Sequence, residues 1–215
     1  NSFLVASITA VIAVALAVVM AYGARISRSS TAAAVNRVAA LGYAVPGAVI
    51  AIGVLIPAAK IDNLLADALA AAFGLSVGLV LTGSLVALVY AYLVRFVAVA
   101  LQSTEAWLAR ITPSMEEAAR GLGASPAGAL ARVHVPLLAP SLAAAGLLVF
   151  VDVLKELPAT FALRPFNFDT LAVEAYHLAA DERLAEAAVP SLVIVAVGLL
   201  PLLLLSRRYF QATRS

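Results

Sequence analysis

The sequence predicts an all-α, polytopic membrane protein with about five transmembrane helices. Hydrophobic residues make up 64% of the 215 residues and charged residues 12%, and the mean hydropathy is +1.04. The apolar residues occur in blocks close to the length that a helix needs to cross the hydrocarbon core. No block has the strict alternation of a barrel strand, and a helix satisfies its own backbone hydrogen bonds in lipid.

Five segments are nearly free of charge for long enough to span a membrane. They are residues 3–22, 38–59, 68–94, 137–154 and 187–205. The stretch 96–111 is apolar at first and then contains Gln102, Glu105 and Arg110. We interpret it as a cytoplasmic continuation of the third helix, with a kink near Arg95. The second segment contains Pro46 and several glycines, which suit either close helix packing or a hinge.

The basic residues fall mainly on one set of loops, which predicts the orientation of the chain because positively charged loops stay in the cytoplasm. The opposite loops hold nine of the twelve acidic residues. This asymmetry places the first residue outside and the carboxy terminus in the cytoplasm. Ten of the fourteen basic residues belong to the cytoplasmic set, namely Arg25, Arg28, Arg37, Arg95, Arg110, Arg120, Arg132, Arg207, Arg208 and Arg214.

Residues 1–215 are expected to form one transmembrane domain, because no low-complexity linker divides them. The chain starts with Asn1 and Ser2 and not with methionine. We interpret it as a piece of a longer polypeptide. It contains no cysteine, so disulfides and thiolate metal sites are excluded.

A polar island at about residues 112–136 interrupts the apolar sequence. It reads Glu117-Ala118-Ala119, three residues, Gly123, nine residues, and then Val133-His134-Val135-Pro136. Pro113 and Ser114 favour the start of a helix near Met115, and Gly123 with Ser125 and Pro126 favours its end.

This spacing resembles the cytoplasmic EAA loop of bacterial ABC importer permeases, in which isoleucine and leucine are usual where Val133 and Val135 stand. The resemblance implies a type I ABC importer permease fold. It also implies that the loop binds a groove of a partner ATPase subunit and passes motion to the membrane helices. The alternative is a solvated loop without a partner.

In that family, the residues of the loop have separate roles. The resemblance implies that Glu117 anchors the loop by charge and that Ala118 and Ala119 allow close approach to the ATPase. Gly123 would permit the turn between the two short helices. Pro136 closes the pattern at the expected distance.

A second block, residues 150–171, contains Lys-Glu-Leu-Pro-Ala-Thr and then Leu-Arg-Pro-Phe-Asn-Phe-Asp-Thr-Leu. It is similar to the corresponding block of ferric iron permeases, and the similarity extends through residues 41–47 and 95–101. This resemblance implies the carboxy-terminal half of a two-half permease for ferric iron in a bacterial inner membrane. Importers of thiamine or phosphonate share the EAA loop and remain alternatives, as does a membrane scaffold without transport.

Asp152, Lys155 and Glu156 form a charged group at the end of the fourth predicted helix. Their spacing places two carboxylates and an ammonium on one helical face. Ionisable groups at membrane depth usually face a wet cavity, and carboxylate oxygens suit a hard cation. The group therefore predicts a translocation pathway, with an ion pair to Arg164 or to the following loop as the alternative.

The sequence contains no nucleophile motif and no glycine-rich phosphate loop, so we expect a transporter subunit and not an enzyme. ATP and Mg²⁺ would be bound by a dimer of partner ATPase subunits, and this chain would hold no cofactor. His134 and His177 are expected on opposite sides of the membrane as surface residues, so no metal site is predicted. Further expected partners are a periplasmic or lipid-anchored binding protein at the outer segment, a second permease half and membrane lipids, but no nucleic acid.

Overall fold

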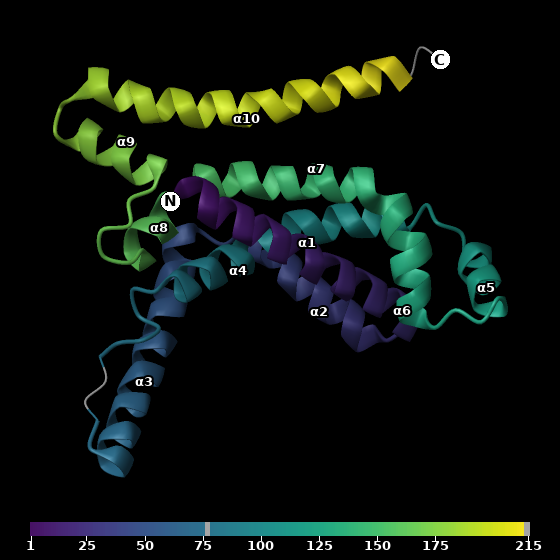
Figure 1. Cartoon of the computed structure of the whole chain (residues 1–215), viewed down its shortest axis with the longest axis horizontal. Helices are drawn as coiled ribbons and strands as arrows, with labels where there is room; N and C mark the ends of the chain where they lie inside the picture. The colour runs from purple at the N-terminus through teal and green to yellow at the C-terminus, as the bar shows by residue number, and fades with distance from the viewer. Residues whose placement is uncertain (76–77, 213–215) are drawn as a thin grey trace.

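Helices are the only regular elements in the part of the chain that the computed structural model describes, residues 1–75 and 78–212 (Figure 1). The all-α prediction is confirmed. In chain order the elements are α1 (Ser2–Ser27), α2 (Ser30–Ala40), the 3-10 turn η1 (Leu41–Ala44), α3 (Gly47–Phe73), α4 (Leu85–Leu108), α5 (Pro113–Gly121), α6 (Pro126–Ala129), the π-helical turn η2 (Leu130–His134), α7 (Val135–Leu154), α8 (Pro158–Leu163), α9 (Leu171–Ala180) and α10 (Leu184–Ala212).

Four helical runs of the described chain are long and apolar enough to cross a membrane. They are α1, α3, α4 and the continuous run Pro126–Leu154 formed by α6, η2 and α7. The start of α10 adds a shorter apolar stretch, Leu184–Leu199. Together these runs agree with a multi-pass membrane protein of four to five crossings.

The core lies where α1, α4 and α7 pack together (Figure 1). Alanines fill much of the contact between these helices, and Ala13, Ala17, Ala91 and Ala100 have no exposed surface. Small side chains let helix backbones approach closely within a membrane. Larger buried residues such as Leu88 occupy the space between these contacts.

The predicted second and third spans, 38–59 and 68–94, are wrong in their bounds. The helix that begins at Ser30 is interrupted before Pro46, which lacks an N–H, and a new helix α3 starts at Gly47. α3 then continues to Phe73, through the charged segment that the sequence assigned to an outer loop. The chain reverses only after Gly74, which has a φ of +66°.

The continuation of α3 through that segment has a specific cause at Asp62. The carboxylate of Asp62 is buried and accepts hydrogen bonds from the backbone N–H groups of Val80, Leu81 and Thr82 at 3.0, 2.8 and 2.7 Å. A charged side chain that is satisfied in this way does not need to lie in a solvated loop. Asp62 therefore fastens the returning chain to α3.

The stretch 96–111 begins inside α4, which runs without interruption from Leu85 to Leu108. Phe96, Leu101 and Leu108 are buried in the core. The expected continuation of the third helix through this stretch is therefore confirmed, but these residues belong to the apolar run of α4 itself, and the kink expected near Arg95 is wrong. The error follows from placing the third span about 17 residues too early.

The two ends of the core bundle carry different elements (Figure 1). The N terminus, α8 and α9 gather at one end, and α5 and α6 lie at the other. The charged groups predicted to have a function occupy both ends.

Candidate functional site

Residues 112–136, here called the coupling loop after their predicted role, begin with two short helices, α5 and α6, joined at Gly123. The N–H of Gly123 donates to the carbonyl of Arg120 at 2.9 Å, and the N–H of Ala124 donates to the carbonyl of Ala119 at 3.0 Å. This pair of bonds is the Schellman arrangement, which requires a left-handed residue after the helix. Gly123 fulfils this requirement with a φ of +85°.

The second part of the coupling loop continues directly into α7. The hydroxyl of Ser125 accepts a hydrogen bond from the N–H of Gly128 at 3.1 Å and so caps α6. η2 follows and joins α7 just before Pro136. Because proline cannot donate to the helical ladder, a π-helical turn beside it accommodates the missing bond.

The predicted contact residues of the coupling loop differ in exposure. Glu117 and Ala118 are exposed, Ala119 and Val133 are half-buried, and Pro136 is exposed. Leu122, between the two helices, is 91% exposed. The loop thus presents both a charge and an apolar side chain to its surroundings. Their role in binding an ATPase stays a prediction.

Arg25 of α1 connects the coupling loop to the membrane helices. Its guanidinium donates hydrogen bonds to the carbonyls of Leu108 and, at 2.7 Å, Ile111, and its Nε lies 3.4 Å from the carboxylate of Glu116. One side chain therefore joins α1, the end of α4 and α5. Sequence reasoning counted Arg25 only as a positive charge, and its position at the end of an apolar run gave no sign of these partners.

Tyr22 makes a second connection, because its hydroxyl donates to the carbonyl of Pro126 at 3.0 Å. Its ring lies 5.0 Å from the ring of His134. His134 is fully buried, and neither ring nitrogen has a hydrogen-bond partner among the described residues. The expectation of a surface histidine at this position is wrong, because η2 turns the side chain towards α1.

The second charged group, at the other end of α7, separates into two ion pairs. Glu156 is 6% exposed and pairs with Arg95 of α4 at 3.0 Å. Its carboxylate also accepts the N–H of Ala159 in α8 at 3.1 Å. Arg164 pairs with Asp169 instead, so the predicted alternative partner of this group is corrected.

The pair also corrects the position of Arg95, which the sequence placed in a cytoplasmic loop. Arg95 lies within α4, 13 residues before Leu108. At 1.5 Å per residue this corresponds to roughly 20 Å of helix. The apolar residues on both sides of Arg95 belong to one unbroken helix, where the sequence pattern predicted a kink.

Asp152 pairs with Lys155 at 2.8 Å, and Asp152 also lines a cavity of about 380 Å³. The other polar lining residues are Tyr43 of η1 and Gln102 and Ser103 of α4. Glu156 is not among the lining residues. The three predicted pathway residues therefore do not act as one group: Asp152 faces a cavity, and Glu156 joins α4, α7 and α8.

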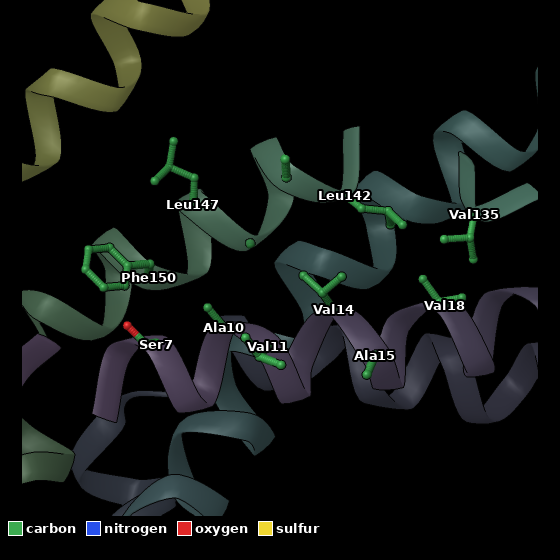
Figure 2. Close-up of a pocket in the computed structure, with 12 residues that line it drawn as sticks. Ser7, Ala10, Val11, Val14, Ala15, Val18, Val135, Leu142, Leu147 and Phe150 are labelled. Atoms are coloured by element: carbon green, nitrogen blue, oxygen red, sulfur yellow. The ribbon is translucent and has the colours of Figure 1, made fainter. Parts of the chain in front are cut away.

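A larger groove of about 930 Å³ lies between α1 and α7 and has a different character (Figure 2). Val135, one of the predicted coupling-loop residues, lines it together with Val14, Leu142 and Phe150. Its twelve lining residues include one hydroxyl, from Ser7, and no charge. Such a surface suits lipid tails or apolar side chains, and it offers little to a hydrated solute.

Solved structures share this arrangement of helices. The crystal structure of a bacterial ABC transporter involved in the import of the acidic polysaccharide alginate matches 97% of this chain and 80% of its own chain, with a TM-score of 0.65 and 16% identity. The chain has the fold of an ABC importer permease. A structure of a bacterial alginate ABC transporter in complex with an alginate pentasaccharide-bound periplasmic protein matches 94% of this permease-like chain, with a TM-score of 0.65 and 15% identity.

Curated relatives of the permease-like chain are also permeases. The Fe(3+)-transport system permease protein FbpB 2 of Haemophilus influenzae is 26% identical over 211 residues, which are 98% of this chain and 38% of the relative. A protein of Salmonella typhimurium named as the 2-aminoethylphosphonate transport system permease protein PhnV is 33% identical over 127 residues, 59% of this chain and 48% of the relative. The chain thus spans less than half the length of either relative. No family model matches it.

Proposed function

We propose that the chain is part of the membrane permease of a binding-protein-dependent ABC importer for ferric iron. The observation that carries the proposal is the attachment of the coupling loop to the membrane helices through Arg25. A displacement of α5 would be passed to α1 through the Arg25–Glu116 pair. It would be passed to the end of α4 through the hydrogen bonds from Arg25 to the carbonyls of Leu108 and Ile111. This is the connection that an ATP-driven permease needs between its cytoplasmic loop and its helices.

Coupling requires that the loop bind two states of the ATPase with different free energies, because an equal contact shifts no equilibrium. Glu117 and Leu122 are exposed on the loop and are available for such a contact. In this proposal a separate ATPase dimer binds ATP and Mg²⁺, and this chain itself needs no cofactor. The coupling loop and the carboxy-terminal end would then face the cytoplasm, with the first residue outside.

The cavity at Asp152 supports a cationic substrate. Its described lining contains one carboxylate, a phenol, an amide and a hydroxyl, and no arginine or lysine. Oxygen ligands of this kind suit hard metal cations. Lys155 neutralises Asp152 in this arrangement and would have to release it when a cation arrives. The similarity to the iron permease relative, 26% identity over 98% of this chain, supports the same substrate.

The complete importer would also contain a substrate-binding protein and a second permease half. The fold neighbour in complex with a periplasmic protein supports the first of these partners. The short length of this chain relative to the iron permease supports the second. α8 and α9 lie at the bundle end that would receive the binding protein (Figure 1).

Uptake of labelled ferric iron by the assembled complex in proteoliposomes tests the proposal. We expect uptake that needs both ATP and the binding protein, and a loss of most uptake with Asp152→Asn. Lys60→Gln is a matched control, because Lys60 lies in α3 and does not line the cavity. ATP hydrolysis without iron uptake would contradict the proposed substrate.

A phosphonate is the second candidate substrate, because the phosphonate permease relative has the higher identity over the part that it matches. Uptake of 2-aminoethylphosphonate, added outside the same proteoliposomes, distinguishes the two candidate substrates. Uptake of the phosphonate without uptake of iron would favour the second. The oxygen-rich cavity favours iron, because its described lining contains no arginine or lysine to bind an anion.

A further inference from the structure

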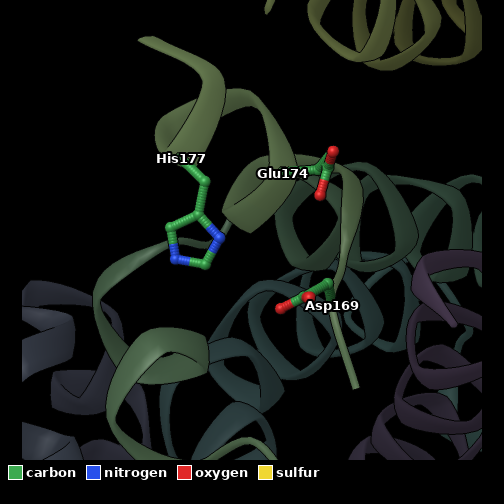
Figure 3. Close-up of side chains that lie close together, drawn as sticks. All are labelled: Asp169, Glu174 and His177. Atoms are coloured by element: carbon green, nitrogen blue, oxygen red, sulfur yellow. The ribbon is translucent and has the colours of Figure 1, made fainter. Parts of the chain in front are cut away.

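We propose that Asp169, Glu174 and His177 bind one first-row transition-metal cation at the end of the bundle that carries the N terminus. One ligand atom from each of the three side chains lies within 4.8 Å of the others. Figure 3 shows the three side chains around one space, with Glu174 and His177 on α9 and Asp169 on the segment before it. The site is separate from the cavity at Asp152 and from the coupling loop.

The positions of the two residues on α9 suit metal binding. Glu174 and His177 are three residues apart and therefore lie on the same face of the helix. A Glu-x-x-His pair on one helix is a spacing by which helical proteins bind iron and manganese. One imidazole nitrogen and two carboxylate oxygens form a mixed ligand set that suits these metals and zinc, with positions left for water or substrate.

Asp169 is held in place by its neighbours. Its carboxylate accepts a hydrogen bond from Arg164, and its backbone carbonyl accepts one from the side chain of Asn1 at 3.1 Å. Two residues further on, the N–H of Leu171 donates to the hydroxyl of Ser2 at 2.7 Å. Metal-binding carboxylates are commonly oriented by such outer hydrogen bonds, and Arg164 leaves the second carboxylate oxygen for a metal.

The imidazole of His177 is also packed and not free in solvent. Its ring centroid lies 5.7 Å from that of Phe161 in α8 and 6.2 Å from that of Tyr176. The side chains of His177 and Asp169 are half-buried, and that of Glu174 is exposed. The three ligands thus come from elements whose positions are fixed, which lowers the ordering cost of binding a metal.

The charge of the cluster favours a cation. Asp169 and Glu174 contribute two negative charges, and Arg164 cancels one of them. A metal would join α9 to the segment that carries Asp169, and that segment is already bonded to the start of α1. The sequence analysis missed this site because it considered a metal site only between His134 and His177, and not between His177 and nearby carboxylates.

Titration of the assembled, metal-stripped complex with Co²⁺, without nucleotide and without the binding protein, tests the inference. We expect visible absorption bands from a His-ligated Co²⁺ ion that saturate at one ion per chain. Glu174→Gln is expected to weaken Co²⁺ binding by at least the roughly 10-fold that loss of an outer partner causes. Glu174 is exposed and makes no side-chain bond within the described structure, so this variant should fold.

Asp181→Asn is the matched control, because it removes an exposed carboxylate just after the same helix that is not one of the three clustered ligands. His177→Gln should remove the imidazole signature while Asp181→Asn retains it. Absence of saturable Co²⁺ binding, or binding that is equal in the wild type and in Glu174→Gln, would overturn the inference. It would leave the proposed import function intact, because that function is tested by uptake.

Discussion

Gly47 at the start of α3 faces the carboxylate of Glu156 so closely that a β-carbon at Gly47 would lie 2.4 Å from Oε1 of Glu156. It would also lie 2.2 Å from Nη1 of Arg95. The absence of a side chain at Gly47 thus leaves the space in which the Arg95–Glu156 pair forms. The start of α3, the middle of α4 and the end of α7 meet at this pair, and α8 contacts it through the N–H of Ala159.

Gly47→Ala is therefore expected to displace the ion pair and to lower the stability of the purified complex. Overpacking of this kind costs about 1–3 kcal/mol. Gly53→Ala in the same helix is the control, because nothing lies within 4 Å of a β-carbon there. Thermal unfolding in detergent should show a lower midpoint for Gly47→Ala alone. Equal midpoints would mean that the pair has room to move.

Arg95 and Glu156 should show a strong energetic coupling. Loss of one partner leaves a buried charge and costs about 3–5 kcal/mol, whereas loss of both costs less. We expect Arg95→Gln and Glu156→Gln each to destabilise the complex more than the double variant does. A double-mutant cycle on unfolding midpoints measures this coupling. Additive effects of the two substitutions would refute it.

Gly123→Val should uncouple ATP hydrolysis from transport. A non-glycine residue in the left-handed conformation costs roughly 1–2 kcal/mol, so the Schellman turn between α5 and α6 would distort. Gly121→Val is the control, since Gly121 has neither a positive φ nor a close neighbour. The measurement is the ratio of substrate imported to ATP hydrolysed. A ratio that falls equally in both variants would point to helix propensity and not to the turn.

Arg25→Gln should loosen the coupling loop from α1 and α4. It removes the charged donor to the carbonyls of Leu108 and Ile111, and hydrogen bonds of this type contribute about 1.5–3 kcal/mol. Arg28→Gln is the control, because Arg28 is exposed and has no ion-pair partner within the described residues. Uptake should fall more than ATP hydrolysis with Arg25→Gln. Full uptake in this variant would remove Arg25 from the proposed transmission.

The orientation of the chain can be tested directly because the sequence contains no cysteine. Leu122→Cys and Phe166→Cys introduce single thiols at positions that are 91% and 101% exposed. An impermeant maleimide added to intact cells should label position 166, and should label position 122 only after permeabilisation. The reverse pattern would invert the topology and exclude contact between the coupling loop and a cytoplasmic ATPase.

Composition was enough to predict the all-α membrane fold, and the turn residues of the coupling loop were enough to place the start and the end of α5. Gly123 and Ser125 act locally, through hydrogen bonds between residues at most five positions apart, so their effect is visible in the sequence. The bounds of the second and third spans were not predictable in this way. Asp62 reads as a loop residue until its three backbone partners, 18 to 20 positions away, are known.

The partners of charged residues were the least predictable part of the site. Arg95 and Glu156 are 61 positions apart, and no periodicity relates residues at such a distance. Arg25 and Ile111 are 86 positions apart. The sequence placed Arg25 and Arg95 in loops and Glu156 at a helix end, because a charge within an apolar helix is costly when it has no partner. Once the partner is known, the same charge marks where two helices are joined.

α4 has no break between Arg95 and Leu108, whereas the run from Pro126 to Leu154 contains a π-helical turn and Pro140. An unbroken helix, α4, and a helix with two irregular points, the run Pro126–Leu154, therefore lie side by side from the end of the bundle that carries the coupling loop. A force applied at that end would move α4 as one rigid helix, whereas the run that contains α7 could bend at its π-helical turn or at Pro140. Relative sliding of the two would open or close the space beside Asp152, which lies between them.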